Sequence, residues 1–197
     1  MFRRFLRGRW LKNYLARKGR PADARFERND VEFGPLLDSD LRAVWRIEKV
    51  SYPSPWPVSV FQDLMDDSLH GFEAGRVEGK LVCYAGYAAK GEIGHIINVC
   101  VHPDIRQRGL GALLLERLLE RLVDEGFTKA TLEVRERNLG AQLLYRKLGF
   151  KAYEQNQGYY FDTEEAAILM DRELIPKIID EPVASRDTTH GTHISFR

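Results

Sequence analysis

The segment that decides the fold reads Val99-Cys-Val-His-Pro-Asp-Ile-Arg-Gln-Arg-Gly-Leu-Gly111. It begins with a β-branched apolar run, which predicts a strand that ends at Val101, and it continues through a turn around Pro103. A leucine-rich stretch with helical periodicity follows the glycines. A strand, a glycine-bearing turn and a helix N-terminus together offer unpaired backbone N–H groups at the positive end of the helix dipole. The segment therefore predicts a site for a phosphate-bearing ligand, which the missing Cβ atoms of the glycines allow to come close.

Composition places the chain among ordinary globular proteins. Its 197 residues suffice for one domain with a sizeable core plus tails, and 44% of them are hydrophobic and 30% charged. The formal net charge of +1 gives no overall attraction to nucleic acid or membranes. Cys83 and Cys100 form no spacing motif, which favours buried thiols in a reducing cytoplasm. No apolar run reaches the roughly 18 residues of a membrane span, so we expect a cytoplasmic protein without a transmembrane segment.

The two ends of the chain differ from its middle. Residues 1–30 form a basic extension, because no acidic residue precedes Pro21 while many arginines and lysines do. The simplest interpretation is a partly helical segment packed loosely on its own domain. The alternatives are contact with RNA, the ribosome or an anionic membrane through residues 1–25, and an organelle transit segment. Residues 180–197 lack periodicity and predict a disordered tail. The folded domain is therefore expected over residues 31–179.

The order of patterns along this domain predicts a mixed sheet with helices on its faces. Alternating or continuous apolar runs predict strands, and apolar residues at helical spacing predict helices. Three prolines in residues 51–57 predict a rigid connector between the first two helices. Strands are expected at residues 31–37, 72–76, 80–89, 91–101, 128–134, 150–154 and 167–173, and helices at residues 41–48, 58–65, 108–125 and 138–148.

Motifs downstream of the glycine turn point to a family. The turn Arg106-x-x-Gly109-x-Gly111 is followed by Leu132-Glu-Val-Arg135, Asn138-x-x-Ala141, Leu144-Tyr-Arg-Lys-Leu-Gly-Phe150 and Tyr159-Tyr160. Over residues 31–174 this combination resembles the GNAT superfamily of N-acetyltransferases and, within it, the RimI family of ribosomal-protein-alanine N-acetyltransferases. The resemblance implies an α/β fold with a mixed, α+β-type sheet of about seven mostly antiparallel strands, splayed at the centre and flanked by about four helices. It also implies acetyl-CoA as the cosubstrate.

The resemblance assigns the cofactor site to two stretches. Amides in the glycine turn would surround the diphosphate as a nest, and Arg106 and Arg108 would add positive charge unless they are merely solvated. The strand that ends at Val101 would offer its free edge to pantetheine, and one of its amides would polarise the thioester carbonyl. Asn138 would cap the next helix and contact the cofactor. The predicted cofactor-binding residues are Val99, Cys100, Val101, Arg106, Gln107, Arg108, Gly109, Leu110, Gly111, Ala112, Asn138 and Tyr145.

Two side chains are implied as catalytic. By resemblance, Glu133 accepts the proton of the acceptor amine, directly or through a water, because an α-amine with a pKa of about 8 is mostly protonated at neutral pH. The alternative for Glu133 is a surface carboxylate paired with Arg135, and His102 and Glu92 are the reserve candidates for the base. By resemblance, Tyr145 donates its phenolic proton to the leaving thiolate; its alternative is a tyrosine at the edge of the core.

The acceptor is expected on an aromatic rim. Trp56 would form one side, and Tyr159 and Tyr160 would form the other, with hydroxyls that can meet a peptide backbone. The alternative is that these aromatic side chains only pack. In the RimI pattern a longer polar loop with an acidic pair follows the tyrosines. Here residues 161–165 form a shorter loop that is followed by Ala166, which weakens any transfer of peptide specificity.

The sequence therefore predicts an acetyl-CoA-dependent N-acetyltransferase that acetylates a protein N-terminal α-amine by direct transfer, with a general base, a general acid and no metal. A ribosomal protein is the acceptor that the resemblance suggests. Two alternatives stay open. One keeps the cosubstrate and changes the acceptor to a lysine side chain or a small-molecule amine. The other is a non-catalytic acetyl-CoA-binding module that the basic extension tethers to RNA or a membrane.

Overall fold

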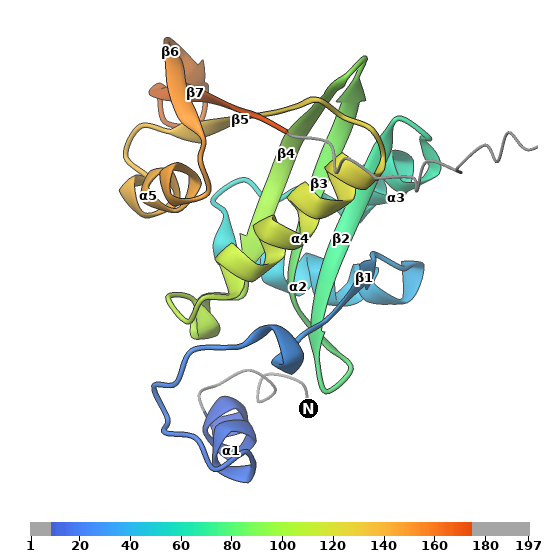
Figure 1. Ribbon diagram of the computed structural model, residues 1–197, viewed down its shortest axis with the longest axis vertical. Coiled ribbons are helices and arrows are strands. Elements are labelled where there is room, and N and C mark those ends of the chain that lie inside the picture. Colours follow the sequence, from blue (N-terminus) through green and yellow to red (C-terminus); the bar gives the residue numbers. More distant parts are fainter. Residues whose placement is uncertain (1–8, 175–197) are drawn as a thin grey trace, which may run out of the picture.

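A seven-stranded sheet with strand order β1-β2-β3-β4-β5-β7-β6 forms the centre of the molecule (Figure 1). The computed structural model describes residues 9–174, and five α-helices lie within that range. The predicted C-terminal tail, residues 180–197, lies outside the described residues. No helix between residues 9 and 174 combines the length and apolarity needed to cross a membrane.

The elements agree with the sequence-based expectations to within a few residues, with two differences. Residues of the basic extension form a regular helix, and the strand expected to end at Glu154 continues to Tyr160. The strands are β1 (Glu32–Pro35), β2 (His70–Val77), β3 (Lys80–Lys90), β4 (Ile93–Val101), β5 (Lys129–Arg135), β6 (Lys151–Tyr160) and β7 (Glu165–Glu173). The helices are α1 (Arg9–Arg17), α2 (Leu41–Ser51), α3 (Val58–Asp66), α4 (Leu110–Asp124) and α5 (Leu139–Lys147), with 3-10 turns η1 (Arg28–Asp30), η2 (Asp38–Asp40) and η3 (Pro103–Ile105).

The central strands β4 and β5 diverge along their length. They form the one parallel pair of the sheet as described, and they pair only through residues 93–96 and 129–132. Beyond Ile96, β4 is paired with β3 alone, and beyond Leu132, β5 is paired with β7 alone. The mixed, mostly antiparallel sheet with a splayed centre is therefore confirmed, and the gap opens toward the C-terminal ends of β4 and β5.

A β-bulge in β4 lies where this divergence begins. Gly86 of β3 faces Asn98, and the next residue of β3 faces Ile96, so Ile97 is an extra residue on β4. One extra residue reverses which side chains point to which face of the sheet. Ile96 accordingly belongs to the core beneath α4, whereas Cys100 belongs to the core beneath α2 and α3. Because of the bulge, the side chains after Ile97 point to the opposite faces of the sheet from those that an unbroken β4 would give them.

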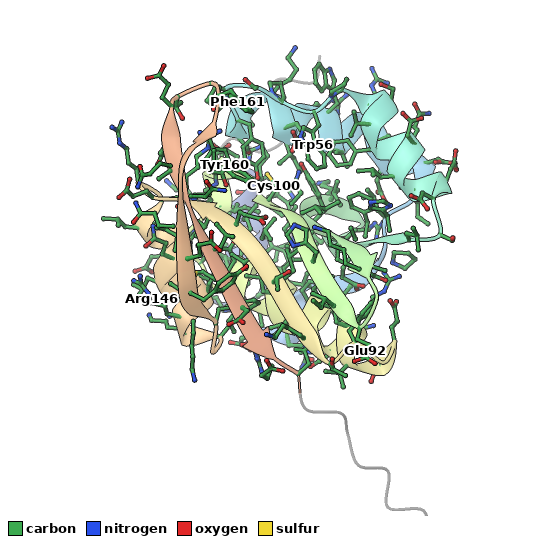
Figure 2. All side chains as sticks on the ribbon, turned by 90° about the horizontal axis from the view of Figure 1, so that it is seen from above. Trp56, Glu92, Cys100, Arg146, Tyr160 and Phe161 are labelled. Atoms are coloured by element: carbon green, nitrogen blue, oxygen red, sulfur yellow. The ribbon has the colours of Figure 1, made fainter. Side chains whose placement is uncertain are left out.

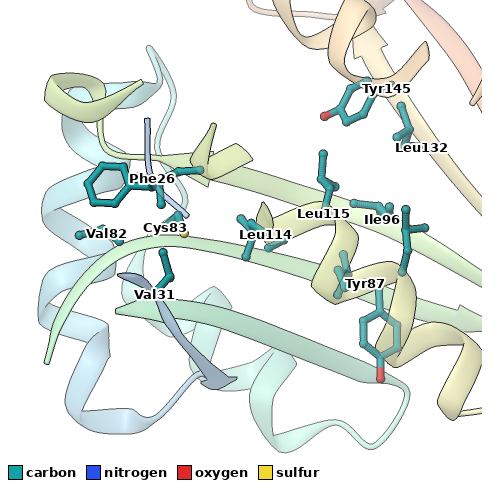
Figure 3. Packing of buried hydrophobic residues seen from close by; sticks show 14 of the residues in the cluster. Phe26, Val31, Val82, Cys83, Tyr87, Ile96, Leu114, Leu115, Leu132 and Tyr145 are labelled. Carbon is teal, nitrogen blue, oxygen red and sulfur yellow. The ribbon is translucent and has the colours of Figure 1, made fainter. Parts of the chain in front are cut away.

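Two hydrophobic cores cover the two faces of the sheet. On one face α4 contributes a row of fully buried leucines, among them Leu114, Leu115 and Leu118 (Figure 3). The periodicity of these leucines follows one side of the helix, as expected from the sequence. On the other face the core is aromatic: the ring of Phe61 lies 5.8 Å from Phe72 and 5.7 Å from Tyr84, measured between ring centroids. The sheet between the two cores is therefore held rigidly where its central strands part.

Helix α1 belongs to the core beneath α4. Leu11, Tyr14 and Leu15 are buried in the same cluster as the leucines of α4. Phe26, in the segment between α1 and β1, is also buried, and its ring stacks on Tyr14 at 6.1 Å. The folded unit therefore extends further toward the N-terminus than the start predicted at residue 31. The packing of α1 is tight, where the sequence suggested a loosely packed segment.

Candidate active site

A cleft with a volume of about 330 Å³ opens where β4 and β5 diverge. Both diverging strands line it, together with the connector between α2 and α3, the start of α5 and the end of β6. Its lining residues are Glu48, Tyr52, Ser54, Trp56, Ile96, Ile97, Asn98, Val99, Leu132, Glu133, Val134, Arg135, Asn138, Tyr145 and Tyr160. The structure therefore brings both predicted catalytic side chains, Glu133 and Tyr145, into one cleft with two of the predicted acceptor residues, Trp56 and Tyr160.

Glu133 is held by a histidine that the sequence analysis did not single out. His95 Nε2 lies 3.2 Å from Glu133 Oε2, and His95 Nδ1 lies 2.8 Å from the hydroxyl of Thr131. These contacts follow from the parallel register, which pairs His95 with Thr131 across the two central strands. Burial raises the pKa of Glu133, but the hydrogen bond and charge of His95, with the charge of Lys90, outweigh burial and bring the pKa below its ordinary value. Glu133 is therefore an ionised carboxylate at neutral pH.

Tyr145 faces the cleft from a buried position on α5. Its ring packs edge-on against Phe150, with 5.9 Å between the ring centroids. Burial raises the pKa of its phenol above the ordinary value, and the neighbouring Tyr160 adds to this. The phenol therefore stays protonated at neutral pH. Among the described residues its hydroxyl has no hydrogen-bond partner, which leaves the proton available to a molecule in the cleft.

The free edge of β4 presents main-chain groups toward the gap. The carbonyl of Val99 accepts a hydrogen bond from the Tyr52 hydroxyl at 3.0 Å, and the carbonyl of Val101 accepts one from Arg106 Nε at 2.9 Å. Because the N–H and C=O groups of one residue point to the same side of an antiparallel strand, the amides of Val99 and Val101 also face away from β3. By the same alternation the backbone of Cys100 faces β3, and its side chain, 2% exposed, is buried toward α2 and α3. Two of the three predicted strand residues thus reach this edge, and Cys100 does not.

The turn before α4 keeps backbone donors available. Gln107 and Gly109 have φ values of +61° and +87°, in the left-handed region that curves successive amides into a nest. Gly109 is the N-cap residue of α4, and its carbonyl accepts the amide of Ala112 at 3.1 Å. In the described part of the chain, the amides of Leu110 and Gly111 have no acceptor. Such donors at the positive end of a helix suit a diphosphate group.

The two predicted phosphate-binding arginines have different surroundings. Arg106 is exposed and bonds to the end of β4 through Nε, as described above. Arg108 Nη1 instead donates to the carbonyls of Ala22 at 2.8 Å and Ala24 at 3.3 Å. Arg108 therefore holds the segment that precedes β1, a role that the sequence analysis did not foresee. The side chain of Leu110 is buried in the core, so only its backbone can serve a ligand.

Helices α4 and α5 pack closely beside the cleft. The Asn138 side-chain oxygen accepts the amide of Ala141 at 3.2 Å, so Asn138 caps α5 as predicted, and it also lines the cleft. A Cβ on Gly111 would lie 3.2 Å from a methyl carbon of Leu144. The glycine at this position therefore lets the N-terminal turn of α4 approach α5 closely.

A second carboxylate, Glu48 of α2, is buried at the cleft. It is 1% exposed, and its Oε2 accepts the backbone amide of Trp56 at 2.9 Å. Its Oε1 accepts the Tyr84 hydroxyl and lies 3.4 Å from the side-chain nitrogen of Asn98. Glu48 thus fixes the proline-rich connector that carries Trp56. The sequence signal for this residue was a glutamate one helical turn after Val44, on the apolar side of the helix.

The tyrosines at the end of β6 are held by Arg135. Its guanidinium carbon lies 3.9 Å from the centre of the Tyr160 ring, and its Nη2 lies 2.9 Å from the carboxylate of Asp162. The alternative ion pair between Arg135 and Glu133 is therefore not formed. Tyr159 packs edge-on against Tyr160 at 5.1 Å but is 42% exposed and does not line the cleft.

The reserve candidates for the base lie away from the cleft. His102 caps η3, where its Nδ1 accepts the amide of Asp104 at 3.2 Å. Glu92 lies in the turn between β3 and β4, at the end of the sheet opposite Trp56 and Tyr160 (Figure 2). Neither residue lines the cleft. Among residues 9–174 no three His, Cys, Asp or Glu side chains gather as a metal site would require.

Known proteins resemble this chain over most of its length. The sequence model of the Acetyltransferase (GNAT) family matches residues 41–150. The ribosomal protein bS18-alanine N-acetyltransferase of Escherichia coli (strain K12) is 32% identical over 137 residues, which cover 68% of this chain and 92% of that relative. A putative enzyme of the same name from Bacillus subtilis (strain 168) is 30% identical over 132 residues, 66% of this chain and 87% of that relative.

Solved structures share the fold. The crystal structure of the ribosomal-protein-S18-alanine N-acetyltransferase from Escherichia coli aligns with a TM-score of 0.68 and 27% identity, over 84% of this chain and 99% of that chain. The crystal structure of Arabidopsis thaliana NAA60 in complex with acetyl-CoA aligns with a TM-score of 0.65 and 18% identity, over 73% of this chain and 98% of that chain.

Proposed function

We propose, from the premise that this chain belongs to the GNAT family of acetyltransferases, that it transfers the acetyl group of acetyl-CoA to the α-amine of a protein N-terminus in the cytoplasm. The family membership makes the chain an N-acetyltransferase; the cosubstrate, the acceptor and the mechanism are the proposal. The observation that carries it is the cleft that holds Glu133 and Tyr145 beside the free edge of β4. The names of the relatives support a ribosomal protein with N-terminal alanine as the acceptor.

The residues around the cleft fit acetyl-CoA, which would supply an activated acetyl group. The amides of Val99 and Val101 would pair with the pantetheine arm as a neighbouring strand does, and one of them would polarise the thioester carbonyl. The unpaired amides of Leu110 and Gly111 would donate to the diphosphate. The bulge in β4 supports this arrangement, because it lies where the edge that would receive the arm begins.

Glu133 would act as the general base. The acceptor amine has an ordinary pKa of about 8 and must lose a proton before its nitrogen can attack. His95 holds Oε2 of Glu133, which leaves Oε1 to take this proton, directly or through a water. The lowered pKa of Glu133 means that the carboxylate is ready to accept a proton throughout the neutral range.

Tyr145 would act as the general acid. As the nitrogen forms its bond to the carbonyl carbon and the carbon–sulfur bond breaks, Tyr145 would give its phenolic proton to the sulfur. A protonated amine gives up two protons in all, the first to Glu133 before attack and the second as the amide forms, while the sulfur gains one from Tyr145. One proton is therefore released to solvent overall, and proton exchange restores both side chains. The buried position of Cys100 and the raised pKa of its thiol favour direct transfer over an acetylated cysteine. A Cys100→Ser variant with unchanged pre-steady-state kinetics would support direct transfer.

The acceptor would enter between Trp56 and Tyr160. Glu48 fixes the connector that carries Trp56, and Arg135 fixes Tyr160, so both sides of this entrance are braced. Tyr159, which is more exposed, would contact the acceptor outside the cleft. A lysine side chain or a small amine is the competing acceptor, because its nitrogen needs the same base and acid.

Peptide acetylation tests the proposal most directly. The full chain is incubated with acetyl-CoA and with peptides that begin with alanine, have an internal lysine and carry either a free or a blocked N-terminus. We expect intact-mass analysis to show one added acetyl group on the free peptide and none on the blocked one. Acetylation of the blocked peptide would assign the activity to lysine. Binding of acetyl-CoA without transfer to any peptide or polyamine would contradict an enzymatic role.

A further inference from the structure

The segment between α1 and β1 lies against the turn that precedes α4 (Figure 1). We call residues 20–26 the strap. The amide of Phe26 donates to the carbonyl of Arg108 at 2.8 Å, and the Arg108 side chain returns hydrogen bonds to the carbonyls of Ala22 and Ala24. Main-chain and side-chain bonds thus join the strap to the turn from which the diphosphate donors project.

Both ends of the strap are anchored in the domain. At one end Phe26 is buried in the core and stacks on Tyr14. At the other end the guanidinium of Arg20 bonds both to the carboxylate of Asp30 and to the carbonyl of Arg25. Asp30 in turn accepts the Tyr14 hydroxyl at 2.8 Å. The backbone of Arg25 is therefore fixed from both sides, and its side chain is presented from a defined position.

Arg25 lies beside the glycine that caps α4. Its Nε and Nη2 atoms lie 3.5 and 3.6 Å from the point where a Cβ on Gly109 would project. The side chain is exposed, and no carboxylate bonds to it among the described residues. Arg106 and Arg108, on the same turn, likewise bond only to carbonyl oxygens there. Three arginines thus lie on or beside the turn at the positive end of a helix, and within residues 9–174 none of the three forms an ion pair with a carboxylate.

We propose that the strap completes the diphosphate subsite of acetyl-CoA, with Arg25 as the side chain that pairs with the diphosphate. The proposal rests on acetyl-CoA being the cosubstrate. A guanidinium presents a planar fork of donors that matches phosphate oxygens, and Arg25 points this fork at the turn whose amides are unpaired. The basic extension then serves the cofactor site. Helix α1 anchors the strap, and Arg25 of the strap supplies a positive charge to the diphosphate in place of Arg108, whose guanidinium holds the strap.

Calorimetry of CoA binding to the full chain tests this role. We expect Arg25→Gln to raise the Kd for CoA by roughly three- to tenfold, the range of one charge-assisted contact at an exposed site. Arg28→Gln is the matched control, because it removes the same charge three residues along the chain. Arg28 pairs with Glu120 of α4 at 2.8 Å, so its loss should leave the Kd within about twofold. Circular dichroism and thermal unfolding confirm that both variants fold.

The 3′-dephospho form of CoA identifies the phosphate involved. If Arg25 pairs with the diphosphate, the loss of affinity in Arg25→Gln persists with this ligand, which lacks the 3′-phosphate. A loss that disappears with this ligand, an unchanged Kd for CoA, or tighter binding by the variant would each overturn the proposal. Failure of the wild-type chain to bind CoA would instead overturn the proposed function, so the two ideas fail in distinguishable ways.

Discussion

At the scale of single residues, two carboxylates of the cleft differ in how many donors they accept. Glu48 accepts hydrogen bonds from the Trp56 amide, the Tyr84 hydroxyl and the Asn98 side chain, so its oxygens are fully engaged. Glu133 accepts one from His95 and keeps an oxygen for the cleft. A carboxylate with both oxygens hydrogen-bonded is suited to positioning its neighbours, whereas one with a free oxygen can take a proton. We therefore expect the two glutamates to have separate roles although both line one cavity.

Glu133→Gln should lower kcat/KM at neutral pH by roughly 100- to 10,000-fold, the usual contribution of a general base. The deficit should shrink above pH 8 or so, because the free amine then forms without help from the enzyme. Initial rates with an alanine-starting peptide between neutral and alkaline pH test this. A variant that retains wild-type kcat/KM at neutral pH would exclude Glu133 as the base.

His95→Gln should change the pH profile more than the rate. Gln can still donate a hydrogen bond, but it cannot carry the positive charge of an imidazole, so burial weighs more and the pKa of Glu133 rises. Below the pKa of the amine, log(kcat/KM) rises with a slope of one, and the slope becomes two where Glu133 is also protonated. We expect this break at higher pH in His95→Gln than in the wild type. An unmoved break would mean that His95 does not position Glu133.

At the scale of elements, α1 is the clearest departure from expectation. Taken over residues 2–15, the apolar positions of the sequence drift around a helical wheel, but within α1 Trp10, Leu11, Tyr14 and Leu15 recur at helical spacing on one side. The structure buries Leu11, Tyr14 and Leu15 because the helix meets two surfaces, the strap and the core beneath α4. Periodicity over α1 alone marks the buried side of the helix, but it does not identify the surface that covers this side, because that surface comes from distant parts of the chain.

Leu15→Ala should therefore lower the free energy of unfolding by about 2–5 kcal/mol, the cost of a cavity in a packed core. Leu143→Ala on α5 is the matched control, because Leu143 is 54% exposed and its loss should change stability by less than about 0.5 kcal/mol. Urea unfolding followed by circular dichroism measures both values. Equal effects of the two substitutions would show that α1 does not contribute to the folded core.

At the scale of the whole molecule, the proposed cosubstrate would contact elements on both sides of the gap between β4 and β5. A ligand at 100 times its Kd stabilises a folded protein by about 2.7 kcal/mol. For a chain of this size we expect saturating acetyl-CoA to raise the melting temperature by about 5–10 °C. Differential scanning fluorimetry measures the shift. No shift at concentrations that saturate calorimetric binding would indicate equal binding to the unfolded chain, contrary to a built site.

Much of the fold could be predicted because its signals are local. The glycines of residues 109–111 and the leucine repeat of α4 lie within one short stretch, and so do Asn138 and the helix that it caps. The contact of His95 with Glu133 could not be found in this way, because it depends on the pairing of His95 with Thr131 in another strand. The local sequence of one strand does not determine its register with the next. The binding of Arg108 to the strap is equally non-local, since its partners Ala22 and Ala24 lie 86 and 84 residues earlier in the chain.

The short pairing of β4 with β5 has a consequence for how such enzymes diversify. Four residue pairs join the half of the sheet that would hold the thioester to the half that carries Glu133 and Tyr160. In the proposed mechanism, main-chain geometry at this junction would therefore set the approach of nucleophile to electrophile. If the acceptor enters beside Tyr160 as proposed, changes in the hairpin of β6 and β7 would alter which amine is accepted while the reacting distance stays constant. The choice of acceptor and the transfer reaction could thus evolve independently within one small protein.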